Sequence, residues 1–137
     1  MQASLPSSDV LPLLERPFGI TGPSEFNAFA LELFQLHAAN NPVYRGFLKE
    51  ARLEPGNVRS WEDIPCLPIT LFRNHHVLLP GLSPALTFTS SGTTGAVTSS
   101  HHVPWPILYE RSFSTAFQEV YGDPRSWRIL ALLPAYL

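Results

Sequence analysis

Cysteine is nearly absent from this sequence of 137 residues, since Cys66 is the only one. An intrachain disulfide is therefore impossible and nothing indicates an oxidising compartment, so we expect a cytoplasmic protein. Lysine is equally scarce: Lys49 is alone, and the nine basic residues are scattered along the chain. Together with a net charge of −2, this scatter argues against a nucleic-acid-binding surface.

Long apolar runs are also missing. No run approaches the roughly 20 residues that span a bilayer, and the N-terminus lacks a basic region followed by an apolar one. We therefore expect neither membrane insertion nor secretion. The 45% hydrophobic content suits one globular domain with a real core, and the 14 prolines predict many short elements joined by fixed turns.

The first half of the chain reads as helical. Residues 1–22 show no clear period and are predicted to be an extended lead. Ser24 is a plausible N-cap for an amphipathic helix over 24–39, and Pro42 can open a second helix that ends before Pro55-Gly56. The two would form a helical hairpin reaching to about residue 58. The stripe expected to face the core in the first helix comprises Phe26, Phe29, Ala30, Leu33, Phe34 and His37.

The second half alternates between strand and helix patterns. After a turn capped by Ser60, short strands are predicted at 77–79, 85–89 and 101–103. A helix is predicted over 106–121, and the apolar run 127–133 is typical of a buried parallel strand. We therefore predict an α/β fold in which 85–137 form a βαβ unit. The stripe expected to be buried on the helix comprises Tyr109, Phe113, Ala116, Phe117, Val120 and Tyr121.

The most informative segment follows the strand at 85–89. Residues 88–95 read Phe-Thr-Ser-Ser-Gly-Thr-Thr-Gly, which places hydroxyls and two glycines where a strand ends. Glycines permit close approach by a ligand, and hydroxyls with turn amides can converge on anionic oxygens. This composition fits the binding of a polyphosphate, although a flexible surface loop has the same composition. The lysine of a Walker loop and the glycine spacing of a dinucleotide fingerprint are both missing.

The five-residue core Ser91-Gly92-Thr93-Thr94-Gly95 resembles the phosphate loop of adenylate-forming enzymes, which include acyl-CoA synthetases and luciferases. Three more segments, 63–69, 71–75 and 130–137, resemble the LuxE-like acyl-protein synthetases in particular. The resemblance covers about residue 26 to the last residue. It implies that 23–137 are the N-terminal part of the large domain of a longer enzyme, inactive as a fragment by itself.

The resemblance also implies a function. Enzymes of this kind use ATP and Mg²⁺ to activate a fatty or other carboxylic acid as an acyl adenylate, and then transfer the acyl group to a protein thiol. The loop residues implied to bind the nucleotide phosphates are Ser90, Ser91, Gly92, Thr93, Thr94 and Gly95, with Thr93 and Thr94 as the catalytic donors. An acyl-reductase or acyltransferase is an expected partner. The family's usual Pro and basic residue are replaced here by Ala96-Val97-Thr98.

Two alternatives remain open: an aryl-CoA or acyl-CoA ligase such as the phenylacetate-CoA ligases, and a non-catalytic phosphate-binding module. Other reactive residues are expected to have plainer roles. Cys66 lies among apolar residues and is predicted to be buried and inert. The pairs His75-His76 and His101-His102 lack ligands at metal spacing, so no metal site is predicted. Arg73 and Tyr136 suit a functional or a structural role equally.

Overall fold

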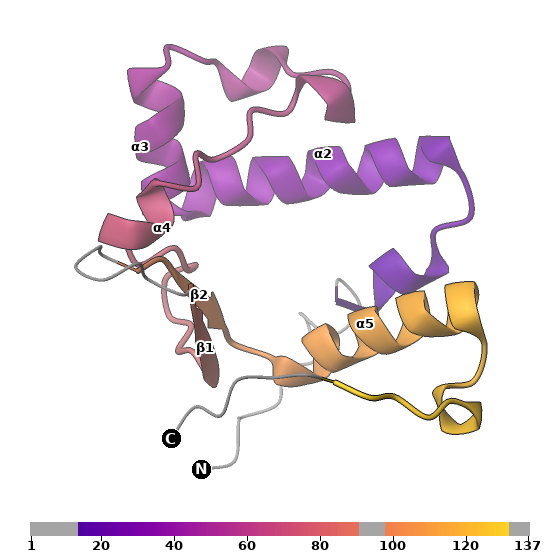
Figure 1. Cartoon of the computed structure of the whole chain (residues 1–137). Coiled ribbons are helices and arrows are strands. Elements are labelled where there is room, and N and C mark those ends of the chain that lie inside the picture. Colours follow the sequence, from indigo (N-terminus) through magenta and orange to yellow (C-terminus); the bar gives the residue numbers. More distant parts are fainter. Residues whose placement is uncertain (1–13, 91–97, 132–137) are drawn as a thin grey trace. The chain divides into compact units, whose positions relative to one another are not determined.

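The computed structural model of the chain describes residues 14–90 and 98–131. The chain divides into two compact units, Met1–Pro106 and Ile107–Leu137. The described part combines helices with one two-stranded antiparallel sheet (Figure 1). The predicted mixture of helices and strands is therefore confirmed, and the segment predicted as an extended lead contains a short 3-10 helix, η1 (Arg16–Gly19).

The first long helix, α2, spans Pro23–Asn40 and confirms the helix predicted over 24–39. Ser24 is not its N-cap, because the helix begins at Pro23 and Gly22 occupies the cap position without a side-chain hydrogen bond. Instead the backbone N–H and hydroxyl of Thr21 donate to Glu25 Oε2 at 2.9 and 3.0 Å. These hydrogen bonds hold the pKa of the Glu25 carboxyl below its usual value. The carboxylate thus fixes the start of the helix.

The second helix, α3 (Pro42–Glu50), also confirms its prediction and rises from the C-terminal end of α2 (Figure 1). The residue between the two helices, Asn41, is only 3% exposed. Its Oδ1 accepts hydrogen bonds from the N–H groups of Val43 and Tyr44 at 3.1 and 3.2 Å. An asparagine N-cap followed by a proline therefore sets the sharp turn between the helices.

The core of the first unit lies between α2 and α3. Its buried residues are Phe34, Ala38, Tyr44 and Leu48, with Phe47, Val58, Ile64 and Leu67 packed against them. The Tyr44 hydroxyl donates to the Pro65 carbonyl at 2.5 Å, which ties the following loop to the core. The predicted stripe is confirmed at Phe29 and Phe34, but Phe26 is 44% exposed and meets the ring of Trp61 edge-on at 5.4 Å.

Short elements link the helices to the sheet. They are η2 (Pro55–Asn57), η3 (Trp61–Asp63) and α4 (Leu71–Asn74). The predicted turn at Ser60 is confirmed, because its side chain accepts from Glu62 N–H. The strand predicted at 77–79 is wrong: Leu78 N–H donates to the His76 carbonyl at 3.0 Å, and this local bond bends the segment away from an extended path.

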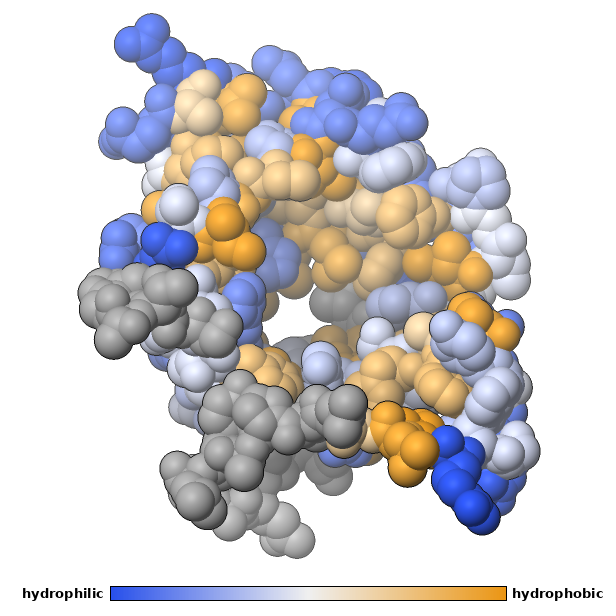
Figure 2. Space-filling model, in the orientation of Figure 1, coloured by the Kyte–Doolittle hydropathy of each residue, from blue (hydrophilic) through white to orange (hydrophobic). Residues whose placement is uncertain are grey.

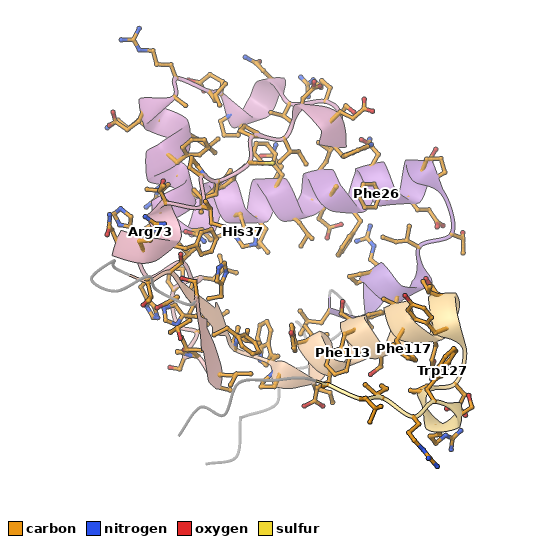
Figure 3. The ribbon with its side chains drawn as sticks, in the orientation of Figure 1. Phe26, His37, Arg73, Phe113, Phe117 and Trp127 are labelled. Atoms are coloured by element: carbon orange, nitrogen blue, oxygen red, sulfur yellow. The ribbon has the colours of Figure 1, made fainter. Side chains whose placement is uncertain are left out.

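The second unit consists mainly of α5, which spans Pro106–Tyr121 and confirms the helix predicted there. Gly122 ends it with a positive φ of 77°, a conformation that glycine adopts without strain. A 3-10 helix follows, η4 (Pro124–Ser126), capped by the Asp123 side chain. The Trp127 indole N–H then donates to the Tyr121 carbonyl at 2.7 Å, and Trp127 lies beside the C-terminal end of α5 (Figure 3).

Two expectations about this unit are wrong. Residues 127–131 form no strand, so the parallel βαβ pairing is not present among the described residues, and Leu132 and Leu133 lie outside them. No residue of α5 is buried: Phe113 is 54% exposed and Val120 71%. An amphipathic helix buries its stripe only against a second layer, and residues 122–131 supply none. Apolar side chains accordingly reach the surface (Figure 2).

Candidate functional site

The sheet is a hairpin whose connection contains the hydroxyl-rich segment. Strand β1 (Leu86–Thr89) pairs antiparallel with β2 (Ser100–Val103), as the predicted strands 85–89 and 101–103 anticipated. Beyond the last pair of the register, Ser90 N–H donates to the Ser99 carbonyl at 3.0 Å. Ser99 N–H in turn donates to Ser90 Oγ, also at 3.0 Å. This reciprocal pair holds the two ends of the connection together.

Ser90 is the one predicted phosphate-binding residue that the structure describes. Ser90 is exposed, whereas Ser99, with which it exchanges hydrogen bonds, is only 7% exposed. The exposed serine is therefore held by a buried one. The remaining predicted site residues Ser91, Gly92, Thr93, Thr94 and Gly95 lie outside the described residues, and so does Tyr136. The two strand ends that flank residues 91–95 are held together, and phosphate binding by those residues stays a prediction.

The two faces of the hairpin differ in chemistry. Side chains alternate between the faces of a strand, and paired residues share a face. One face therefore carries the polar residues Thr87, Thr89, Ser100 and His102, and the other carries Leu86, Phe88, His101 and Val103. On the polar face Thr87 Oγ1 and His102 Nδ1 are joined by a hydrogen bond of 3.0 Å. The adjacent residues His101 and His102 therefore lie on opposite faces.

Helix α4 and the residues after it lie along β2 and place one ring on each face. The Phe72 ring stacks on His101 with centroids 4.7 Å apart and an interplanar angle of 23°. The His76 ring meets His102 edge-on at a centroid distance of 4.0 Å. Sequence patterns did not predict this packing, because α4 was not expected and only a short strand after it, at 77–79, was predicted. The four-residue helix is too brief to show a period.

The part of the sequence that contains the hairpin has no acidic residues. No Asp or Glu occurs between Asp63 and Glu110, while Arg73 and four of the five histidines do. Burial lowers the pKa of His102, and the neighbouring His76 and His101 lower it further. The hairpin therefore offers hydrogen-bond donors to an anion and has no carboxylate that would repel it.

Arg73 and Cys66 occupy different settings. Arg73 lies in the last turn of α4 (Figure 3) and pairs with no carboxylate in the described part of the chain. Cys66 is exposed, which corrects the expectation that it is buried, because the prolines on either side keep this segment on the surface of the helical core. Its neighbour Tyr44 has a pKa raised by burial and, to a smaller extent, by the Cys66 charge.

No three His, Cys, Asp or Glu side chains gather as metal ligands within residues 14–90 and 98–131. Over the same residues, no helix has both the length and the apolar character needed to cross a bilayer. Comparisons of the chain with models of protein families, with curated proteins and with solved structures gave no match. Function therefore has to be argued from the hairpin itself.

Proposed function

We propose that this protein activates a carboxylic acid, above all a fatty acid, with ATP and passes the acyl group to a protein thiol, as LuxE-like acyl-protein synthetases do. The observation that carries the proposal is the closed hairpin. Ser90 and Ser99 bind each other reciprocally and so hold the ends of the segment that contains Ser-Gly-Thr-Thr-Gly. Because these ends are already held together, a ligand that binds the segment does not have to bring them together.

The proposed reaction has two steps. An oxygen of the substrate carboxylate attacks the α-phosphorus of ATP, which forms the acyl adenylate and releases pyrophosphate. A thiolate then attacks the acyl carbonyl, which forms a thioester and releases AMP. In the first step the hydroxyls and amides between Ser90 and Gly95 would hold the β- and γ-phosphates in line and stabilise the charge on the leaving pyrophosphate.

Mg²⁺ would supply positive charge that offsets the phosphates. It prefers carboxylate, water and phosphate oxygens as ligands. The segment between Asp63 and Glu110 contains no carboxylate, so we assign no Mg²⁺ ligand to the hairpin. The ion would be carried by the phosphates of ATP.

The release of pyrophosphate from ATP, measured with and without a fatty acid substrate, tests the proposal. We expect release in the presence of a fatty acid, and a loss of about 10- to 1000-fold after Thr93→Ala or Thr94→Ala, because each removes a donor from the transition state. Thr70→Ala is the matched control, since Thr70 is exposed and its side chain caps no helix. The assay uses the longer enzyme of which the resemblance implies this chain to be the N-terminal part. Absence of release from that enzyme, or equal rates in all variants, contradicts the proposal.

The acceptor thiol separates the leading proposal from its nearest alternative. Transfer of the acyl group to coenzyme A in place of a protein cysteine would identify an acyl-CoA or aryl-CoA ligase. Binding of pyrophosphate without turnover would identify the non-catalytic phosphate-binding module, which the carboxylate-free hairpin also suits.

A further inference from the structure

The polar face of the hairpin carries imidazole and hydroxyl groups that are not part of the phosphate-loop motif. His102 is joined to Thr87 by a hydrogen bond of 3.0 Å, and Thr89 and Ser100 form the next pair on the same face, adjacent to Ser90. The His76 ring lies edge-on against His102 at 4.0 Å. Two imidazoles and three hydroxyls therefore share one face at the mouth of the connection.

The charges around His102 come from few groups. Strand β1 has no ionisable side chain, and β2 contributes only His101, which lies on the opposite face. Helix α4 and the residues that follow it contribute Arg73, His75 and His76. Within the described residues none of these groups forms an ion pair with a carboxylate. An anion at this face would therefore meet positive or neutral groups only.

We propose that this face is a proton-linked oxyanion subsite, in which the His102 imidazole, against which the His76 ring lies, takes up a proton as a phosphate-type dianion binds beside Thr89 and Ser100. The inference rests on the proposed function and deepens it: the imidazole would supply the positive charge that the family's basic residue supplies elsewhere and that Ala96-Val97-Thr98 lack. The ligand is the phosphate tail of a nucleotide or free pyrophosphate.

Linkage between proton and anion gives the subsite a measurable signature. Without the anion, burial and the neighbouring histidines keep the pKa of His102 below its ordinary value. A bound dianion favours the charged imidazole and raises that pKa. Each unit by which the anion raises the pKa makes the anion bind up to about tenfold more tightly in acid than in alkali.

Nuclear magnetic resonance of the histidine side chains tests this inference in the full chain. The imidazole signals are titrated from pH 5 to 8 with and without pyrophosphate, at constant ionic strength set by sodium chloride, and again with ATP in a parallel series. We expect both ligands to raise the pKa of His102 and to leave that of His37, in α2, unchanged. A stronger effect of ATP would identify the nucleotide tail as the source, and a stronger effect of pyrophosphate the free anion.

Variants separate a direct contact from a general effect. His76→Gln and His102→Gln should each flatten the pH dependence of pyrophosphate affinity; the His76 side chain forms no hydrogen bond within the described residues. His101→Gln, on the opposite face, should keep that pH dependence. The inference is overturned if pyrophosphate fails to bind, if it binds without moving the pKa of His102, or if His76→Gln retains the full pH dependence.

The pKa response of His102 tests the subsite separately from the proposed catalytic activity. A pKa response of His102 in a protein that releases no pyrophosphate with any acid would support the subsite and refute acyl activation. Release of pyrophosphate that requires the carboxylic acid substrate, without a pKa response of His102, would support acyl activation and refute the subsite.

Discussion

Ser90→Ala is the substitution that tests the closed hairpin most specifically. It removes the hydroxyl oxygen that accepts from Ser99 N–H at 3.0 Å, and it leaves the backbone bond from Ser90 N–H to the Ser99 carbonyl in place. One such hydrogen bond contributes about 0.5–1.5 kcal/mol net. Local opening of the hairpin end should therefore become about 2- to 13-fold more frequent.

Amide hydrogen exchange measures this opening directly. The Ser99 amide should exchange faster by that factor in Ser90→Ala, and Ser90→Thr should restore slow exchange because threonine keeps the oxygen. Ser83→Ala is the matched control: this exposed serine precedes β1, and its side chain forms no hydrogen bond with any other described residue. An unchanged rate for the Ser99 amide in Ser90→Ala would refute the claim that the side chain holds the connection closed.

Three further predictions concern the helical core. Leu48→Ala, at a residue 3% exposed, should lower the free energy of unfolding by about 2–5 kcal/mol in urea titrations, because it leaves a cavity. Asn41→Ala should cost about 1–2 kcal/mol, since the N–H groups of α3 that it caps lose their acceptor. Burial raises the pKa of Tyr44, so stability should be complete below the unfolded pKa near 10.0 and fall as pH rises above it. Tyr44→Phe should abolish that alkaline loss.

Matched controls define what would contradict these predictions. Ile69→Ala and Asn57→Ala alter an exposed aliphatic residue and an exposed asparagine, and each should change the free energy of unfolding by less than about 0.5–1 kcal/mol. Equal costs at Leu48 and Ile69, or at Asn41 and Asn57, would contradict the core described above. If Tyr44→Phe lost stability above pH 10 as steeply as the unaltered chain, a different group would be responsible for the alkaline loss.

Periodicity predicted the long elements well because their information is local. The apolar spacing in α2 and α5 predicted the bounds of both helices to within one residue, although Ser24 was taken as the N-cap of α2. The strands on either side of the hydroxyl-rich segment were also predictable, since their β-prone residues stop where hydroxyls and glycines begin.

The predictions that were wrong concern features that depend on contacts with residues distant in the sequence. A continuous apolar run such as 127–133 predicts a strand only where a neighbouring strand exists to pair with it. The stripe of α5 is likewise exposed for want of a second layer. At the site, the contacts of His76 with His102 and of Phe72 with His101 join residues far apart in the chain, so no local pattern could have indicated them.

The most direct measurement is a crystal structure of the protein with Mg²⁺ and a non-hydrolysable ATP analogue. Our account predicts that the β- and γ-phosphates contact amides and hydroxyls between Ser90 and Gly95, at the tip of the hairpin closed by Ser99. A phosphate tail bound to another part of the molecule, with this tip empty, would contradict it.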